Sequence, residues 1–181
     1  MGERVPAGLE EAVTAAGSRL LVADDFADVV DELVSDARTA VASPRLLEAA
    51  PWLTAAVTAA GVRVVAVDPE DPLSTVADVD IGLVRGELIV TETGSVLVDE
   101  HDLADRGVSM LTRRLVQVVP ASAIVARLED VATWLSRRPS GAGFASLITG
   151  PSRSADIERS LTIGVQGPSE VDVVLLGEVR W

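Results

Sequence analysis

Three short apolar runs in the first 67 residues are separated by two segments in which apolar residues recur at helical spacing. The runs are Leu20–Ala23, Thr39–Ala42 and Val62–Val67. The helical segments between them are Asp24–Arg38 and Ser43–Gly61, and Pro51 predicts a kink or two short helices in the second. Strands that alternate with helices over short loops form parallel, right-handed wound sheets. The first half of the chain therefore predicts an α/β fold.

The second half of the chain adds strands joined by tight turns. Its strand-like runs are Asp80–Val84, Glu87–Thr91, Val96–Val98, Leu115–Val119, Ala145–Thr149 and Val171–Leu176, the last of which we expect to close the sheet. Arg85-Gly86 and Thr93-Gly94 indicate turns, Ser122–Arg137 is the clearest helix, and His101–Asp105 looks exposed. We predict one three-layer α/β domain over residues 1–181, with a mostly parallel sheet and antiparallel edge strands.

A polar turn joins the run Ala145–Thr149 to a segment of helical character, Ala155–Leu161. The turn contains Gly150, Pro151, Ser152, Arg153 and Ser154. Ser154 suits a helix N-cap, and Asp156 lies in the first turn, where an acid favours the helix dipole. Free backbone amides, two hydroxyls and Arg153 could bind a carboxylate or phosphate there. An ordinary capped helix, with Arg153 paired to a local acid, uses the same residues, so both interpretations stay open on spacing alone.

Composition excludes several kinds of chemistry. The chain has no Cys and one His, His101, which excludes disulfides, thiolate nucleophiles, Cys-ligated clusters and multi-histidine metal sites. All 15 basic residues are Arg, set against 28 acids for a net charge of −13, so the surface should repel nucleic acid and anionic lipid. We expect no metal and no cofactor, and no Gly-rich dinucleotide motif follows the first strand.

The sequence also bears on the location and assembly of the protein. No apolar run approaches the length that spans a membrane, and Met1–Ala7 lacks the basic start and apolar core of a signal peptide. The sequence therefore predicts a cytoplasmic protein that binds neither nucleic acid nor membrane, while a small anionic ligand is the expectation for the turn after Gly150 if that turn is an anion site. A homo-oligomer is left open.

Several motifs together resemble the LUD domain family, the family of lactate-utilisation protein C. The motifs are T-GPS-R-S-A-DIE over Thr149–Glu158, G-V-QGP over Gly164–Pro168, the ETG turn of Glu92, Thr93, Gly94 and Ser95, and an R-L…P…I segment that runs from Arg114 to Ile124. The resemblance is good from about Asp80 to Leu176 and weak before that. Two positions depart from the family pattern, because the family usually has His where this chain has Ala123 and Gln166.

The resemblance implies a fold like that of sugar-phosphate isomerases and coenzyme A transferases, in which a glutamate can act as nucleophile or base. It makes Glu92 the catalytic candidate, although a turn-stabilising acid would look the same. The ligand-binding candidates are Thr93, Gly94, Ser95, Arg114, Gly150, Ser152, Arg153, Ser154, Asp156, Gln166 and Gly167. We expect Glu92, Arg114 and the turn after Gly150 to converge on one pocket, and Arg113 to be a surface residue paired with nearby acids.

The function implied by the resemblance is lactate utilisation. The chain would be an accessory or ligand-binding component of a system that oxidises L-lactate to pyruvate with iron–sulfur partner subunits, since it has no thiolates of its own. Two alternatives remain. One is a stand-alone enzyme that acts through Glu92 on a small carboxylate, coenzyme A thioester or phosphorylated compound. The other is a structural subunit with a vestigial pocket.

Overall fold

The computed structural model describes residues 5–139, 141, 143–154, 162–163 and 167–177. The helices are α1 (Leu9–Ala15), α2 (Val30–Val34), α3 (Pro44–Ala49), α4 (Leu53–Ala59), α5 (Pro72–Val76), α6 (Leu103–Leu111) and α7 (Glu129–Leu135), with single 3-10 turns at Phe26–Asp28 and Ala121–Ala123. The strands are β1 (Arg19–Ala23), β2 (Thr39–Ala42), β3 (Arg63–Val64), β4 (Ile81–Val90), β5 (Ser95–Glu100), β6 (Arg114–Pro120), β7 (Ile124–Val125), β8 (Phe144–Ile148), β9 (Arg153–Ser154), β10 (Thr162–Ile163) and β11 (Glu170–Leu176).

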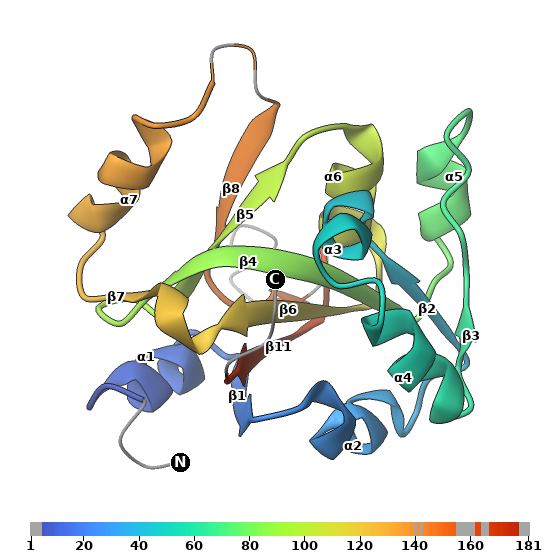
Figure 1. Ribbon diagram of the computed structural model, residues 1–181, viewed down its shortest axis with the longest axis horizontal. Helices are drawn as coiled ribbons and strands as arrows, with labels where there is room; N and C mark the ends of the chain where they lie inside the picture. The colour runs from blue at the N-terminus through green and yellow to red at the C-terminus, as the bar shows by residue number, and fades with distance from the viewer. Residues whose placement is uncertain (1–4, 140, 142, 155–161, 164–166, 178–181) are drawn as a thin grey trace.

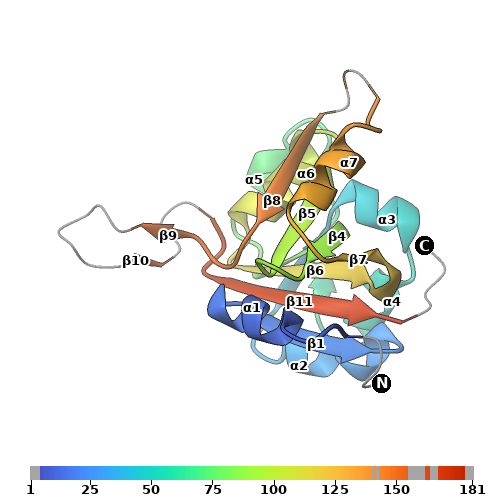
Figure 2. The ribbon, with the colours of Figure 1, turned by 90° about the vertical axis from the view of Figure 1, so that its left-hand side faces the viewer.

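Six of these strands form a parallel sheet in the order β3-β2-β4-β6-β11-β1. Ile81 of β4 lies in register with Arg114 of β6, and Glu170 of β11 lies on the other side of Arg114. The last strand, β11, thus lies inside the sheet rather than closing it, because β1 pairs with its outer side over the whole of Arg19–Ala23. Figures 1 and 2 show the sheet between its helices.

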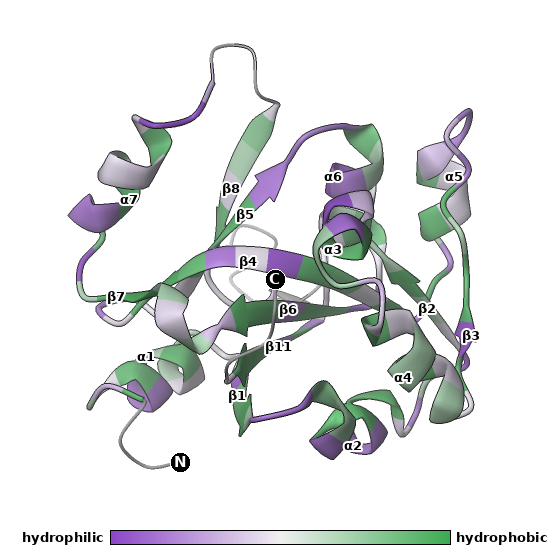
Figure 3. Cartoon of the chain, viewed as in Figure 1, coloured by the Kyte–Doolittle hydropathy of each residue, from purple (hydrophilic) through white to green (hydrophobic). Residues whose placement is uncertain are grey.

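Strand β4 belongs to two sheet segments. Its first half pairs with β2 and β6, and its second half pairs with β7 and, in antiparallel fashion, with β5, which in turn pairs with β8. A bulge between Gly86 and Leu88 marks the change. The middle of β4 is hydrophilic whereas its ends are hydrophobic (Figure 3). The sequence prediction of two strands with a turn at Arg85-Gly86 is therefore wrong.

Helices cover both faces of the parallel sheet, so the predicted α/β fold with antiparallel strands is confirmed. Leu33, Leu46 and Leu53 of α2, α3 and α4 are buried in one core. Leu9, Val76 and Val108 of α1, α5 and α6 are buried in the core on the opposite face. Helix α7 lies over the antiparallel segment, where its Val131 packs with Leu88, Val90 and Leu97.

Two sequence signals in the first half predict the local structure closely. Strand β2 has the predicted bounds, Thr39–Ala42. The Ser43 side chain accepts a hydrogen bond from the Leu46 amide, Pro44 begins α3, and the chain forms two short helices around Pro51, as predicted. Strand β3, by contrast, is an edge strand of two residues rather than a run buried on both faces.

Two predictions in the second half are wrong. Residues 122–137 do not form one helix: Ile124 and Val125 pair with β4, and α7 begins only at Glu129. The stretch His101–Asp105 is not simply an exposed loop, because Asp102 caps α6 and Asp105 is buried. No helix of the described residues is long and apolar enough to cross a bilayer.

Candidate functional site

The turn of Glu92–Ser95 connects β4 to β5 and holds the beginning of α7 in place. The Thr91 and Glu92 amides donate to the Val125 and Ala126 carbonyls at 2.9 and 3.2 Å. The Glu92 carboxylate oxygen Oε2 accepts from the Leu128 amide at 3.1 Å, while the rest of the side chain is exposed. Glu92 thus makes the backbone contact of a turn-stabilising acid. Its predicted catalytic role is untested.

The Ser95 hydroxyl of this turn forms hydrogen bonds with two other hydroxyls, that of Thr93 in the same turn and that of Thr149, which directly follows β8. The Ser95 Oγ lies 2.7 Å from the Thr93 Oγ1 and 2.7 Å from the Thr149 Oγ1. Ser95 is buried and Thr93 is half-buried. The chain of three hydroxyls brings the ETG turn next to Gly150, so the structure unites these two sequence motifs.

Both motifs pack on helix α1 through glycines with positive φ. A Cβ on Gly94 (φ +68°) would lie 2.7 Å from the Ala12 carbonyl and the Val13 amide, and a Cβ on Gly150 (φ +74°) would overlap the Ala16 carbonyl oxygen. The Arg153 guanidinium donates to the same Ala16 oxygen at 2.9 Å. The α1 backbone therefore occupies the space directly against these glycines.

The turn after Gly150 differs from the prediction in one respect. The Ser152 amide donates to the Pro168 carbonyl at 3.0 Å, so it is not the free amide that an anion site would need. Gly167 lies against the Ser152 side chain, and Arg153 and Ser154 form β9, which pairs with β10. Asp156, Gln166 and the predicted helix Ala155–Leu161 lie outside the described residues.

Arg114 lies at the opposite end of the sheet from Glu92. It starts β6 beside Ile81, whereas Glu92 follows the far end of β4, on the order of 30 Å away along ten residues of strand. The predicted convergence of Glu92, Arg114 and Gly150 on one pocket is therefore wrong. Parallel strands bring only like ends together, and Arg114 is the first residue of its strand while Glu92 follows the last residue of its own.

The Arg114 side chain has protein partners at that end. It donates to the Leu33 carbonyl at 2.8 Å and to Asp36 at 3.1 Å, and it pairs with Glu170. Arg113 pairs with the same two acids, which confirms the expectation for Arg113. The role of Arg114 in ligand binding stays a prediction.

A buried ion network was missed by the sequence analysis. Asp99 of β5 pairs with Arg138 and with Arg45, at 3.2 Å from the latter, and His101 Nε2 lies 3.2 Å from the same carboxylate. Nearby, the Asp105 carboxylate accepts the Arg45 and His101 amides, and burial raises its pKa. The chain order gives no signal for this network, because Arg45, Arg138 and the segment from Asp99 to Asp105 lie far apart in the sequence. The described residues contain no group of His, Cys and acidic side chains able to hold a metal ion.

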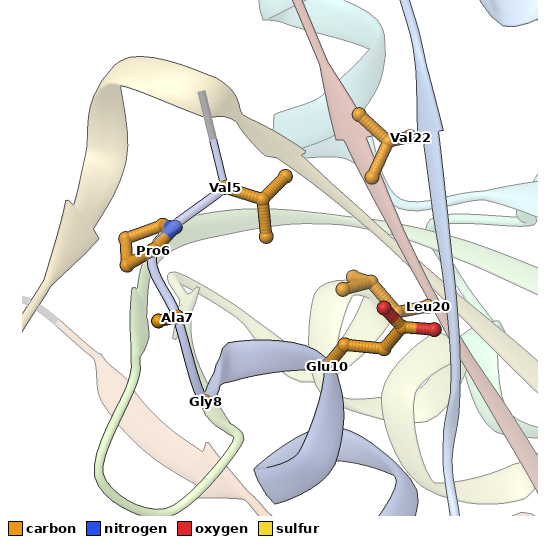
Figure 4. A pocket seen from close by; sticks show the side chains of 7 residues that line it. All are labelled: Val5, Pro6, Ala7, Gly8, Glu10, Leu20 and Val22. Carbon is orange, nitrogen blue, oxygen red and sulfur yellow. The ribbon is translucent and has the colours of Figure 1, made fainter. Parts of the chain in front are cut away.

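Several clefts open on the described surface, and their charges differ. One, of about 450 Å³, lies between the start of the chain and β1; its walls are Val5, Pro6, Leu20 and Val22, and its charged group is the Glu10 carboxylate (Figure 4). A second, of about 390 Å³, lies under α7 between Trp134 and Arg137 of that segment and Leu88 of β4. An anion would be repelled by Glu10 in the first cleft, whereas the second has the Arg137 guanidinium as well as the Asp130 carboxylate.

Comparison with known proteins identifies the family to which this chain belongs. A model of the LUD domain matches residues 9–176, further toward the N-terminus than the sequence motifs reach. The chain belongs to the LUD domain family. A crystal structure of a DUF162 family protein from Deinococcus radiodurans has a similar fold, with a TM-score of 0.62 and 20% identity over 94% of both chains.

Curated members of this family are similar to the LUD chain over part of their length. Lactate utilization protein C 1 of Bacillus mycoides (strain KBAB4) is 33% identical over 116 residues, which are 61% of this chain and 49% of the relative. Lactate utilization protein C of Shouchella clausii (strain KSM-K16) is 34% identical over 105 residues, or 55% and 44% of the two chains. The chain thus spans about half the length of the curated relatives it matches.

Proposed function

We propose that this LUD-domain protein is a component of an L-lactate utilisation system, in which it binds a small anionic ligand. The observation that carries the proposal is the family match over residues 9–176, together with relatives named lactate utilization protein C. A cytoplasmic location is part of the proposal.

Within such a system the chain would be an accessory subunit. Oxidation of lactate to pyruvate removes two electrons, which iron–sulfur subunits can accept, and this sequence has no Cys with which to ligate a cluster. Its contribution would be to bind a ligand or to join the redox subunits. Partner subunits rich in Cys are therefore the ones that it should accompany.

The contacts of Glu92 favour one alternative, a structural subunit. Its carboxylate accepts the Leu128 amide, which is what a turn-stabilising acid does, and Ala123 and Gln166 stand where the family usually has His. A catalytic acid would lose its activity on conversion to an amide, whereas a structural acceptor would keep its hydrogen bond. Glu92→Gln separates the two roles.

Growth on L-lactate tests the proposal. A host strain that lacks this gene should grow poorly with L-lactate as carbon source and normally on pyruvate, and the intact gene should restore growth. Restoration by the Glu92→Gln gene would mark Glu92 as structural, and its failure, with normal protein levels, would mark it as catalytic. Normal growth of the deletion strain on lactate would contradict the proposed function.

A further inference from the structure

We propose that the cleft under α7 binds a monocarboxylate with a flat apolar body, held at its carboxylate by Arg137. The cleft encloses about 390 Å³, within the range of ~300–1,000 Å³ usual for small-molecule sites. It is lined by Leu88 of β4, Val125 of β7, and Asp130, Thr133, Trp134 and Arg137 of the α7 segment.

The apolar residues that line the cleft also contact other parts of the protein. Leu88 is only 5% exposed and packs in the core that α7 covers. The Arg138 guanidinium lies 5.6 Å from the Trp134 ring centre, and Arg138 itself pairs with Asp99 and donates to the Phe144 carbonyl at 2.9 Å. Trp134 is half-buried and lines the cleft, so its indole can contact an aromatic or other planar group of a ligand.

Arg137 provides the charge that such a ligand needs. Unlike its neighbour Arg138, it is exposed, and its guanidinium has no hydrogen-bond or ion-pair partner among the described residues. Arg113 and Arg114, by contrast, are engaged by acids. In a chain of net charge −13, an available guanidinium beside an apolar wall can hold a carboxylate bidentately.

The other end of the cleft sets the selectivity. Asp130 lies seven residues before Arg137, which is about 10 Å along the helix axis. A second carboxylate on the ligand would face Asp130 and be repelled, so the cleft favours monocarboxylates over dicarboxylates. Thr133 also lines the cleft, and its hydroxyl can hydrogen-bond a polar substituent of the ligand. Lactate has too little apolar surface to cover Trp134, Leu88 and Val125, so this ligand class goes beyond the proposed function.

Fluorescence titration of the purified full chain with phenylacetate tests the proposal. We expect a saturable change in tryptophan emission that is lost in Trp134→Phe, and an affinity that falls about tenfold or more in Arg137→Gln, as for lost hydrogen bonds to a charged group. Arg127→Gln is the matched control: this exposed Arg precedes α7 and does not line the cleft. Arg137→Lys should bind with intermediate affinity, since it keeps the charge but not the planar fork.

Three outcomes would overturn the proposal. They are the absence of a saturable change, equal affinity in Arg137→Gln and Arg127→Gln, and a change that persists in Trp134→Phe. 1,4-Phenylenediacetate and phenethylamine should bind at least about fivefold more weakly than phenylacetate, because the first carries a second carboxylate at the far end of the ring, toward Asp130, and the second reverses the charge. Equal binding of either would also overturn it. The titration involves no lactate metabolism, so its failure would leave the proposed function standing.

Discussion

Gly150 shows how single residues join the family motifs to the rest of the molecule. Its positive φ and the adjacent Ala16 carbonyl leave no room for a side chain, and Gly94 meets α1 in the same way one turn of helix earlier. The motif glycines are thus explained by packing on α1. A ligand role for them has to be tested apart from this structural one.

Gly150→Ala should lower the free energy of unfolding by about 2–5 kcal/mol, since it combines a left-handed backbone with an overlap on the Ala16 carbonyl. Gly61→Ala is the control, because Gly61 has the same backbone conformation (φ +85°) and open space around it. It should cost only about 1–2 kcal/mol. Urea unfolding of both variants measures the difference, and equal losses would mean that α1 does not pack against Gly150.

Asp80 joins the start of β4 to the start of β2, and its bonds make stability depend on pH. Its carboxylate accepts the Arg38 and Thr39 amides at 2.9 and 3.0 Å, and these hydrogen bonds lower its pKa. The folded pKa then lies below the unfolded value of about 3.9, so the unfolded chain binds the proton more readily. The stabilisation is present above about pH 4 and is lost as the pH falls through the folded pKa.

We therefore expect Asp80→Asn to destabilise the protein by about 1–2 kcal/mol at pH 7, and by less at pH 3, which lies below the pKa of about 3.9 of the carboxyl in the unfolded chain. Asp78→Asn, two residues earlier and exposed, should change little at either pH. Asp105 affects the free energy of unfolding in the opposite direction. Burial raises the pKa of its carboxyl above the unfolded value, so the folded chain binds the proton more readily, and the free energy of unfolding should fall as the pH rises above about 4. A difference between Asp80→Asn and wild type that grows on acidification would refute the role of Asp80.

At the scale of elements, helix α7 depends on partners at both ends. Glu92 accepts the Leu128 amide just before α7, and Arg138 joins Asp99 just after it. The helix itself buries little, since Leu128 and Leu135 are more than 40% exposed and Val131 is its buried residue. The ETG motif thus shapes the cleft wall through the position of α7.

Glu92→Ala should weaken hydrogen-exchange protection at the Leu128 amide by about fivefold, which corresponds to the loss of one hydrogen bond of about 1 kcal/mol. Glu92→Gln keeps an acceptor oxygen and should restore most of the protection. As a control, Glu129→Ala removes a neighbouring exposed acid and should leave that amide unchanged. If Glu92→Ala and Glu129→Ala behaved alike, Glu92 would not hold α7.

Helices and strands are predicted well from the sequence where a few adjacent residues determine them. The Ser43-Pro44 cap and the buried run of β2 are examples, since both depend on adjacent residues. Gly86 misled the prediction, because its missing side chain serves close packing of Val96 and Val119 within a continuous strand. Ile124 fits the helical period, yet the free edge of β4 pairs with it instead.

The candidate site was less predictable than the fold. The family motifs correctly suggested that the ETG turn and Gly150 lie close together. The residues around Arg114, by contrast, do not show at which end of the sheet it lies, because that depends on the direction of its strand. Trp134 and Arg137 share a helix face at a spacing of three, which every helix offers. The contact of Trp134 with Arg138, and the pairing of Arg138 with Asp99 of β5, are seen only in the folded chain.

For the whole molecule, the excess of acids should make stability depend on salt. With 28 acids against 15 arginines, net repulsion in the folded state exceeds the attraction of the surface pairs. The free energy of unfolding should rise between low salt and 0.5 M NaCl as the Debye length shrinks from ~30 Å to a few ångströms. The rise should be smaller at pH 4.5, where the net charge is lower. A fall with salt at pH 7 would show that paired charges dominate instead.

The proposed participation of the protein in L-lactate oxidation can be measured in cell extracts. Extracts of a strain that lacks the gene should convert labelled L-lactate to pyruvate slowly, and purified protein added back should restore the rate in proportion to its amount. Gly150→Ala protein, which we expect to be poorly folded, should restore less than Gly61→Ala protein. Extracts that oxidise L-lactate at the same rate with and without the protein would contradict the account.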